Sequence, residues 1–342
     1  MKVVVFHEHG GPEVLRYEEV PDPKPGPEEV LIRVKATSVN HLDIWVRRGL
    51  PGMKLELPHI PGADAAGTIE EIGERVEGLE PGRRVVINPN FSCGSCEYCL
   101  QGEDSLCVHY KILGEQVEGG YAELLKVPAK NVIPLPDHLP FEEAAAATLV
   151  FMTAWRMLIT RAGLRPGEDI LILGAGGGVG TAAVQIAKLV GARVFATAST
   201  EEKLERLREL GADVLINYRT SEFDKEVRRL TERRGVDVVV DCVGAETWVK
   251  SLRSLAKDGR LVTCGATTGP NPQTDIRYIF WNQLHIIGST MASTKELLDV
   301  LKLLWAGKLR PVIHRVMPLR EAAEAQRLLE ERQVFGKVVL VP

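Results

Sequence analysis

Residues 170–188, ILILGAGGGVGTAAVQIAK, decide the fold of this chain. They read as a buried strand, a turn dense in glycine and an Ala-rich helix. Glycines allow a tight turn and let the backbone approach a pyrophosphate, which the free N–H groups of the helix N-terminus then bind. The GxGxxG fingerprint is a variant, because Ala175 stands where the strict pattern has glycine. On its own this motif is a weak signal, and the alternative is a strand–helix corner that binds nothing.

A regular alternation of apolar and amphipathic stretches surrounds this turn. Apolar runs typical of buried strands recur at 192–198, 214–218, 236–244, 260–266 and 284–290. Stretches with an apolar stripe at helical spacing lie at 181–191, 200–211, 221–235 and 245–259. This alternation predicts βαβ units and an α/β fold with a doubly wound parallel sheet.

The rest of the chain has a different texture. Before about residue 135, short β-branched runs such as VLIRVKATSV are separated by Pro and Gly clusters, which indicates a β-rich module. After residue 290 come two amphipathic helices and a closing strand, GKVVLVP, which we expect to return to that module. We therefore predict one domain formed by residues 1–136 and 290–342 and a dinucleotide-binding domain formed by residues 137–289.

The end of the second predicted strand indicates which nucleotide binds. NAD binding usually places an acid there to hold the ribose 2′-OH, but this chain offers Ser199, Thr200 and then Lys203. Hydroxyls and a cation favour a 2′-phosphate, so we predict NADP(H), with NAD(H) as the alternative. The competing interpretation is that Lys203 lies on a solvated helix face, where Glu201 and Glu202 weaken its attraction for phosphate. The predicted cofactor contacts here are Gly176, Gly177, Gly178, Val179, Gly180, Ser199, Thr200, Lys203 and Tyr218.

Four of the six cysteines cluster in the run CGSCEYCLQGEDSLC, at Cys93, Cys96, Cys99 and Cys107. Four thiolates on a short loop can close a tetrahedral Zn²⁺ site with no position left for substrate, so we predict one structural zinc per chain. An iron–sulfur cluster uses similar spacing, but nothing else in the chain suggests electron transfer. Cys242 and Cys264 stand alone at strand ends, and we expect both to be small apolar core residues.

Composition argues against several classes of protein. The chain has 342 residues, and its 46 acidic against 42 basic residues give a net charge of −4. This balance lacks the basic excess expected of a protein that binds nucleic acid or an anionic membrane surface. The apolar stretch near residue 150 is broken by Arg156 and is too short to cross a bilayer. The start, MKVVVF, has no basic region followed by a long apolar stretch, so we expect a cytoplasmic protein.

Several motifs together resemble the medium-chain dehydrogenase/reductase superfamily over essentially the whole chain. The motifs are PGRRVVI (81–87), GGYAELLKVP (119–128), TAWRML (153–158), the AGGGVG turn and DVVVDCVG (237–244). The cysteine lobe, at about residues 90–110, is similar to that of the zinc-containing alcohol dehydrogenases. The resemblance implies a GroES-like catalytic domain, a Rossmann domain and an active site in the cleft between them.

The catalytic zinc of that family is where this sequence departs. The three ligand positions of zinc alcohol dehydrogenases correspond to Asn40, Ala63 and a position near Leu149. An amide, a methyl and an isobutyl group cannot hold Zn²⁺. The segments VNHLDIWVRRG (39–49) and PGADAAG (61–67) instead resemble the zinc-independent quinone oxidoreductases, so we expect a zinc-free active site.

Hydride transfer without zinc requires positioning of the nicotinamide and stabilisation of the oxygen that gains charge. We predict that Asn40 donates a hydrogen bond to that oxygen and that Asp43 and Asp64 orient neighbouring groups. The alternative for Asn40 and Asp43 is local turn and cap chemistry. A metal site rebuilt from His59 and Asp64 is not favoured, because no spacing requires these side chains to converge.

Further contacts come from the resemblance alone. It places Thr153 beside the nicotinamide, and it implies contacts from strand ends at Val243, Gly265, Ala266, Ser289 and Thr290. Residues 276–290 resemble the edge strand through which such Rossmann domains pair, which predicts a homodimer or homotetramer.

Three functions follow as hypotheses. The favoured one is an NADPH-dependent reductase of quinones or α,β-unsaturated carbonyls that uses no catalytic zinc. The second is an alcohol dehydrogenase or aldehyde reductase, either metal-free or with an unexpected set of metal ligands. The third is a nucleotide-binding protein that has lost its activity. We expect the substrate to be a small carbonyl compound, quinone or alcohol, with neither nucleic acid nor membrane as a partner.

Overall fold

A computed structural model describes residues 1–342, which divide into two compact units. One unit comprises Met1–Leu149 and Ser293–Pro342, and the other comprises Val150–Ala292. Helix α3 (Phe141–Trp155), followed by a π-helical segment (Arg156–Arg161), leads from the first unit into the second. The domain limits at 136/137 and 289/290 stay predictions.

The second unit is built from alternating strands and helices. Its elements are β10 (Asp169–Ile172), α4 (Gly178–Val190), β11 (Arg193–Ala198), α5 (Glu201–Glu209), β12 (Val214–Asn217), α6 (Phe223–Leu230), β13 (Val236–Val240), α7 (Trp248–Ser254), β14 (Leu255–Thr263), α8 (Ile276–Asn282) and β15 (His285–Gly288).

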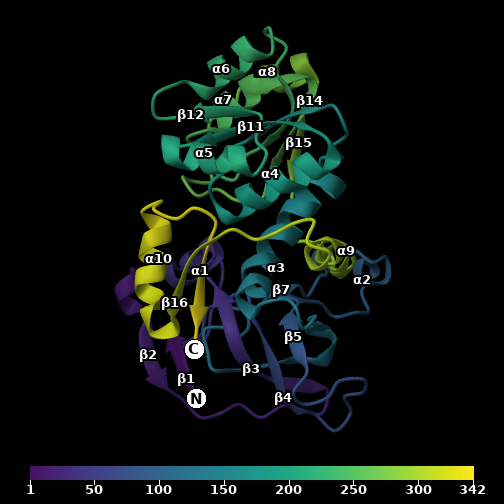
Figure 1. The fold of residues 1–342 in the computed structure, drawn as a ribbon, viewed down its shortest axis with the longest axis vertical. Helices are drawn as coiled ribbons and strands as arrows, with labels where there is room; N and C mark the ends of the chain where they lie inside the picture. Colours follow the sequence, from purple (N-terminus) through teal and green to yellow (C-terminus); the bar gives the residue numbers. More distant parts are fainter. The chain divides into compact units, whose positions relative to one another are not determined.

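The six strands of this unit form one parallel sheet in the order β12-β11-β10-β13-β14-β15. In chain order this is 3-2-1-4-5-6, the strand order of the doubly wound nucleotide-binding fold. Figure 1 shows α4 and α5 on one face of the sheet and α6, α7 and α8 on the other. Both faces are therefore covered, and the central strands are mainly apolar, with Leu171, Phe195, Val239 and Leu261 in the core. The predicted α/β fold with a doubly wound parallel sheet is confirmed.

One predicted element is wrong in its extent. The helical stretch expected at 245–259 ends at Ser254, and strand β14 begins at the next residue. Leu255 pairs with Val236 of β13, and the register then shifts before Arg260 pairs with Val238. Pairing with the neighbouring strand outweighs helix propensity here, because it buries Leu255 and Ala256.

The first unit is β-rich. Its elements are β1 (Lys2–Val5), η1 (Pro12–Val14), β2 (Arg16–Glu19), β3 (Glu29–Ser38), α1 (His41–Arg48), β4 (Ala66–Ile72), β5 (Arg84–Ile87), β6 (Asn90–Phe91), α2 (Glu97–Leu100), η2 (Asp104–Leu106), β7 (Lys111–Ile112), β8 (Leu124–Pro128), η3 (Ala129–Asn131), β9 (Val132–Pro134), α9 (Thr294–Trp305), β16 (Ile313–Pro318), η5 (Leu319–Glu321), α10 (Ala322–Glu330) and β17 (Lys337–Val341).

The C-terminal strands return to the sheet of the first unit. This sheet has seven strands, six of them in the order β16-β17-β3-β4-β5-β9, while β8 also pairs with β3. Strand β17 runs antiparallel to β3 with Val339 opposite Ser38, and the amide of Val39 donates to the carbonyl of Val338 at 2.9 Å. This register brings the start of β17 beside the start of α1, far apart in sequence. In neither unit is any helix long and apolar enough to span a membrane.

Candidate functional site

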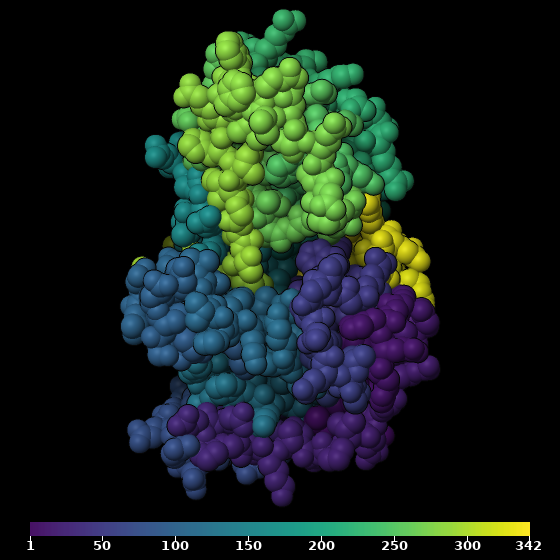
Figure 2. Space-filling view, turned by 180° about the vertical axis from the view of Figure 1, so that it is seen from behind, coloured from purple at the N-terminus to yellow at the C-terminus, as the bar shows by residue number.

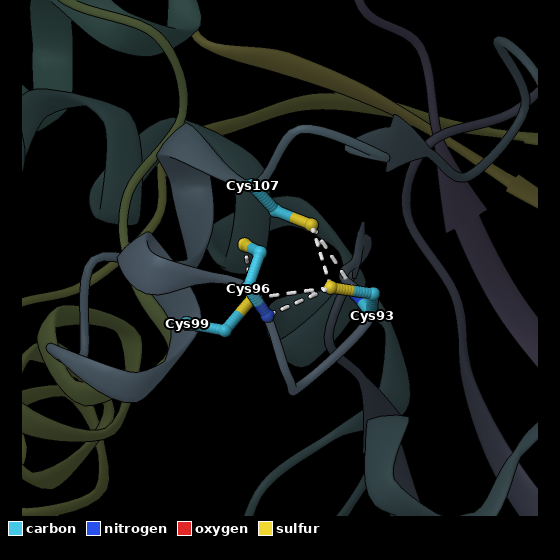
Figure 3. A group of neighbouring side chains, drawn as sticks. All are labelled: Cys93, Cys96, Cys99 and Cys107. Carbon is cyan, nitrogen blue, oxygen red and sulfur yellow. Dashed lines mark hydrogen bonds between the residues drawn. The ribbon is translucent and has the colours of Figure 1, made fainter.

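The four clustered cysteines converge on one point (Figure 3). Cys93 lies in the loop after β6, Cys96 and Cys99 belong to the start and body of α2, and Cys107 ends the 3₁₀ turn η2. Their Sγ atoms all lie within 4.8 Å of one another. The separations are 3.5 Å for Cys93–Cys107, 3.5 Å for Cys96–Cys99 and 4.0 Å for Cys93–Cys99. A tetrahedral site with Zn–S bonds of about 2.3 Å has edges of about 3.8 Å, so these thiols fit Zn²⁺.

Hydrogen bonds within the cysteine lobe, and one pair from Thr294, hold the lobe in place. The amides of Cys96 and His109 point at the sulfurs of Cys93 and Cys107, each at 3.3 Å. Asp104 accepts hydrogen bonds from the Thr294 amide at 2.9 Å and its hydroxyl at 2.5 Å. Figure 2 shows this part of the chain, in blue, at the molecular surface. The fourth-ligand position is filled by a cysteine, so a zinc ion held here has a structural role.

Asn40 and Asp43 lie at the N-terminus of α1. The carboxylate of Asp43 accepts the backbone N–H of Asn40 at 2.8 Å, so Asp43 closes the first helical turn, as the local-cap alternative requires. The side chain of Asn40 points elsewhere: its Nδ2 donates to Oδ2 of Asp64 at 2.8 Å and to the carbonyl of Ser38 at 3.3 Å. Asp43 is therefore a cap, whereas Asn40 belongs to a buried polar network.

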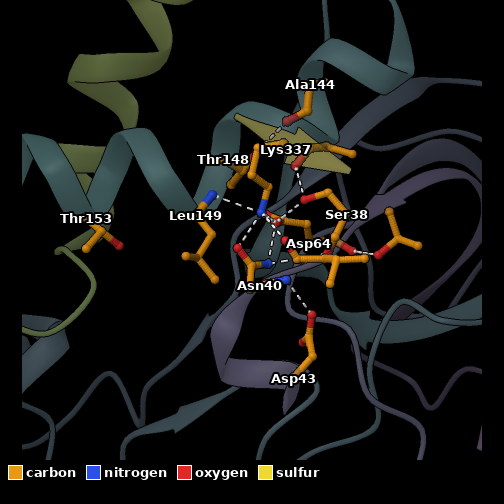
Figure 4. Close-up of polar contacts among 12 residues, drawn as sticks. Ser38, Asn40, Asp43, Asp64, Ala144, Thr148, Leu149, Thr153 and Lys337 are labelled. Carbon is orange, nitrogen blue, oxygen red and sulfur yellow. Dashed lines mark hydrogen bonds and ion pairs between the residues drawn. The ribbon is translucent and has the colours of Figure 1, made fainter. Parts of the chain in front are cut away.

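Asp64 is the centre of that network (Figure 4). Its Oδ2 accepts the hydroxyl of Ser38 at 2.6 Å, and its Oδ1 accepts the backbone N–H of Leu149 at 3.0 Å. The ammonium of Lys337 lies 3.5 Å from Oδ2 and donates to Oδ1 of Asn40 and to the carbonyl of Val39. The sequence interpretation missed Lys337. Its signal was a lysine at the first residue of an otherwise apolar strand, KVVLV.

Burial sets the electrostatics of this region. It raises the pKa of Asp43 to about 7, against the opposing effects of the Asn40 amide, Lys337 and the Tyr121 hydroxyl 3.1 Å away. Oδ1 of Asp43 is buried without a hydrogen-bond partner, which agrees with a carboxyl group that ionises reluctantly. Burial likewise lowers the pKa of Lys337, while Asp64 and Asp43 raise it. The network thus combines one buried cation with two buried carboxyl groups.

The side chains at the family's catalytic zinc positions do not fit a metal. Asn40 is bonded to Lys337 and Asp64, and Ala63 and Leu149 contribute only carbon atoms. An ammonium beside Asn40 repels a divalent cation. His59 contacts the carbonyl of Gly114 at 3.1 Å and forms no bond with Asp64, so it does not complete a metal site.

The glycine turn between β10 and α4 has the shape of a phosphate cradle. Gly174 has a φ of +59°, and α4 begins at Gly178, so the first amides of this helix have no partner within the helix. A Cβ on Gly180 would lie 2.5 Å from the Gly174 carbonyl oxygen and 2.6 Å from Cα of Ala175. Ala175 keeps an ordinary negative φ and bonds to Thr197, which explains why the turn tolerates the variant residue. These residues fit a bound pyrophosphate.

Some of the residues after β11 make local contacts that the structure defines. Oγ1 of Thr200 accepts the amide of Lys203 at 3.3 Å and so caps α5, and Glu201 accepts a hydrogen bond from Asn217 at 2.7 Å. Partial burial lowers the pKa of Lys203, the carboxylate of Glu202 opposes this effect, and the positive charges of Arg206 and Arg219 act in the same direction as burial. Three cations therefore gather beside Ser199 and Tyr218, a concentration of charge that the sequence interpretation only partly identified.

The loops after β13, β14 and β15 hold the predicted nicotinamide contacts. Oδ1 of Asp241 accepts the amides of Val243 at 2.9 Å and Gly244 at 3.0 Å, which fixes the first loop. The amide of Ser289 donates to Thr263 at 2.9 Å, yet its hydroxyl oxygen is buried without a partner. An orphaned hydroxyl at the carboxyl edge of a parallel sheet fits a ligand with polar groups of its own.

The structure also gives the positions of the remaining predicted residues and corrects one expectation. Thr153 is buried in α3, and Gly265, Ala266 and Thr290 lie in the loops after β14 and β15. The expectation that Cys242 and Cys264 stand alone is wrong, because their Sγ atoms lie 3.3 Å apart. Spacing in sequence did not reveal this pair, since it depends on the register of two neighbouring strands.

Comparison with known proteins identifies the family. Residues 26–137 match the alcohol dehydrogenase GroES-like domain, and residues 178–306 match the zinc-binding dehydrogenase domain. The chain belongs to the zinc-type alcohol dehydrogenase-like branch of the medium-chain dehydrogenase/reductase superfamily, as its motifs predicted.

Full-length relatives make the class of activity plain. The chain is 35% identical to an acryloyl-coenzyme A reductase and 36% identical to an NAD-dependent alcohol dehydrogenase, both from Sulfurisphaera tokodaii, with 100% of each chain covered. A solved structure titled NAD-dependent alcohol dehydrogenase matches with a TM-score of 0.96 and 51% identity over 100% of both chains. The protein is an NAD(P)-dependent oxidoreductase.

Proposed function

We propose that this protein is an NADPH-dependent reductase of α,β-unsaturated carbonyl compounds or quinones that works without catalytic zinc. One observation carries the proposal: Asn40, Asp64 and Lys337 form a closed, buried network where zinc alcohol dehydrogenases hold their metal. A saturated alcohol needs a strong Lewis acid or base to lose its proton before hydride transfer. An activated C=C bond needs neither, because conjugation already polarises its β-carbon.

The chain's own groups would act on the oxygen of the substrate. Bound NADPH would supply the hydride for the β-carbon, and a solvent proton completes the saturated product. The Nδ2 bond from Asn40 to the carbonyl of Ser38 is the longer of its two, at 3.3 Å, so this is the hydrogen bond that would break for Asn40 to donate to an enolate oxygen. Lys337 holds Oδ1 of Asn40 and places a positive charge nearby, which favours a developing negative charge.

The name of one relative narrows the substrate class. Acryloyl-coenzyme A is an α,β-unsaturated thioester, and the reductase with that name is 35% identical to this chain over its full length. An enoyl thioester is therefore a specific candidate alongside simple enones and quinones. The alcohol dehydrogenase names of other relatives, including the 51% identical structure, support the second candidate function, oxidation of an alcohol or reduction of an aldehyde.

Steady-state assays distinguish the two candidates. The zinc-loaded protein would be tested with NADPH and an enone, a quinone or acryloyl-coenzyme A, and with NADP⁺ or NAD⁺ and primary or secondary alcohols. We expect NADPH oxidation by the unsaturated compounds, reduced about tenfold or more in Asn40→Ala and unchanged in the control Asn282→Ala. Alcohol oxidation without any turnover of the unsaturated compounds would reject the proposal.

We also propose NADP(H) as the preferred nucleotide and one structural zinc per chain. The cations Lys203, Arg206 and Arg219 beside the end of β11 support a 2′-phosphate. The near-tetrahedral spacing of the four cysteine sulfurs supports zinc. Metal analysis of the purified protein checks the second point, because the proposal requires about one zinc per chain and a catalytic site of the usual kind would raise this to two.

Pairing of two copies through β15 is the oligomeric form that we propose. Strand β15 is at the edge of its sheet, and beside it Ile276, Phe280 and Trp281 are 69%, 63% and 77% exposed. An unpaired edge with exposed apolar side chains is typical of an interface. Light scattering should show a dimer or tetramer that Ile286→Lys dissociates and that Val316→Lys, an exposed apolar position on β16, leaves intact.

A further inference from the structure

Cys242 and Cys264 occupy matching positions just beyond the ends of two neighbouring strands, β13 and β14. Val240 of β13 pairs with Val262 of β14, and each cysteine lies two residues further along its chain. The two Sγ atoms are 3.3 Å apart. Neighbouring parallel strands are about 4.8 Å apart, which falls within the Cα separations that a disulfide accepts. The backbone therefore already holds the two thiols in reach of a bond.

Their surroundings distinguish this pair from the cysteine lobe. Both residues are partly exposed at the carboxyl edge of the sheet, but the thiol of Cys264 is itself buried, so a small reagent would meet Cys242 first. No histidine, acid or further cysteine joins them in a possible metal site, unlike the four cysteines of the lobe. The pair is free to react as a dithiol.

The loops that carry the pair also carry proposed nicotinamide contacts. Val243 follows Cys242 directly, and Gly265 and Ala266 follow Cys264. Amides of Thr267 and Thr268 donate to the carbonyls of Cys242 and Val243, at 3.4 Å and 2.8 Å, so the two loops are already tied together. A change in the separation of the sulfurs would therefore reach residues that we propose to contact the nicotinamide.

We propose that Cys242 and Cys264 form a reversible disulfide by exchange with a low-molecular-weight disulfide, and that this modification weakens nucleotide binding. The weakening of nucleotide binding rests on the nucleotide site of the proposed function, whereas formation of the disulfide does not. Closing the sulfurs from 3.3 Å to about 2.05 Å draws the two loops together.

The exchange takes place in two balanced steps. The thiolate of Cys242 attacks one sulfur of the small disulfide, which forms a mixed disulfide and releases one small thiol. The thiolate of Cys264 then attacks the Cys242 sulfur, which forms the protein disulfide and releases the second small thiol. Two protein thiols are oxidised and one small disulfide is reduced. The order of attack follows from the hydrogen bond with Cys242 and from burial, which raise the pKa of the Cys264 thiol well above its usual value.

The coupling is reciprocal. If the disulfide weakens nucleotide binding, bound nucleotide must shift the exchange equilibrium toward the free thiols by the same factor. We therefore expect NADPH or NADH to slow and reduce disulfide formation. This reciprocity separates a true coupling from general damage by oxidation.

The experiment uses the full-length, zinc-loaded protein and oxidised glutathione. Peptide mapping without reduction should show a Cys242–Cys264 disulfide, and dithiothreitol should reverse it. Cys264→Ser should retain glutathione on Cys242, whereas Cys242→Ser should show little glutathione on Cys264. Zinc release is followed in the same samples, because the lobe cysteines provide an internal comparison and should stay metal-bound while the pair oxidises.

Nucleotide affinity is measured by fluorescence titration with NADPH and NADH. We expect oxidation to weaken binding about tenfold in the native chain and to leave the Cys242→Ser/Cys264→Ser double variant unchanged. Free thiols at both positions after oxidation would overturn the proposal, and so would a disulfide that leaves affinity unaltered. A protein that binds neither nucleotide in its reduced form would instead reject the proposed function, while the peptide map still decides whether the disulfide forms.

Discussion

The ammonium nitrogen of Lys337 lies 3.5 Å from Oδ2 of Asp64, and the two side chains are only 4% and 1% exposed. These residues come from the two separate segments of the first unit and meet because β17 pairs with β3. Ions buried this deeply lose their hydration, and the loss is offset only while each keeps its partner and its hydrogen bonds. Asn40, Ser38 and the amide of Leu149 provide those hydrogen bonds.

Removing one charge of this pair should destabilise the protein strongly. Lys337→Met leaves Asp64 buried without its cation, and we expect the free energy of unfolding to fall by about 3 to 5 kcal/mol. Chemical denaturation measures the loss, with the exposed Lys35→Met on β3 as the control for charge. A Lys337→Met/Asp64→Asn double variant should recover part of the stability. Equal losses for Lys337→Met and Lys35→Met would show that the pair has no special role.

Asp43 should make stability depend on pH in an unusual direction. Its pKa in the folded protein is about 7, raised by burial from 3.8, so the folded state retains a proton that the unfolded state has released. Between these two values stability therefore decreases as pH rises, by up to about 1.4 kcal/mol per pH unit. Asp43→Asn cannot ionise and should lack this contribution.

Melting temperatures measured from pH 4.5 to 8 test this prediction. The native chain should lose stability relative to Asp43→Asn as the pH increases across that range. Comparing the two proteins at each pH cancels the effects of all other titrating groups, including the cysteine lobe. Parallel pH profiles would mean that Asp43 ionises normally in the folded protein.

Local patterns in the sequence predicted the fold better than they predicted the site. The glycine turn and the βα alternation were sufficient for the parallel sheet, because each strand and helix carries its own periodicity. The four lobe cysteines were also recognisable, since they lie within a single short segment. The contact of Lys337 with Asn40, by contrast, joins residues about three hundred positions apart, which no local pattern encodes.

Two incorrect predictions from the sequence have the same physical origin. The end of α7 and the pairing of Cys242 with Cys264 both depend on the register between β13 and β14. Register is decided by packing in three dimensions, and the sequence of either strand alone does not contain it. Sequence reasoning therefore located the carboxyl edge of the sheet but missed which side chains meet there.

Loss of the lobe zinc should affect stability more than substrate preference. Cys107 is buried, and Cys107→Ser removes one of four ligands, so we expect the zinc content to fall from about one per chain to near zero. The melting temperature should fall as well, because a structural site contributes its binding energy to folding. Cys264→Ser, the control, should retain its zinc. A variant without zinc but with an unchanged melting temperature would contradict the structural role.

Lys203 should determine nucleotide choice through its charge. Replacing this residue of the first turn of α5 with glutamate substitutes repulsion for attraction toward a 2′-phosphate, so the KM for NADPH should rise tenfold or more. The KM for NADH should change little. The exposed Lys225→Glu on α6 is matched in charge and should alter neither value. Equal changes for both nucleotides would mean that Lys203 does not contact the 2′-phosphate.

Replacing Gly177 or Gly180 by alanine should have different effects on stability and on nucleotide affinity. A Cβ at Gly180 would lie 2.5 to 2.7 Å from backbone atoms of Gly174 and Ala175, so Gly180→Ala must displace α4 and lower stability. At Gly177 the nearest atom would be 3.4 Å away, and its φ of −82° is open to alanine, so that variant should fold normally.

If the turn binds a pyrophosphate, however, the methyl group of Gly177→Ala occupies the space through which the ligand approaches the backbone. We therefore expect Gly177→Ala to keep its melting temperature and lose at least tenfold in affinity for NADPH, measured by fluorescence titration. Gly180→Ala should lose both stability and affinity. If Gly177→Ala kept native affinity, the pyrophosphate would have to bind away from this turn. A pyrophosphate in contact with the backbone at Gly177 would leave no room for the added methyl group.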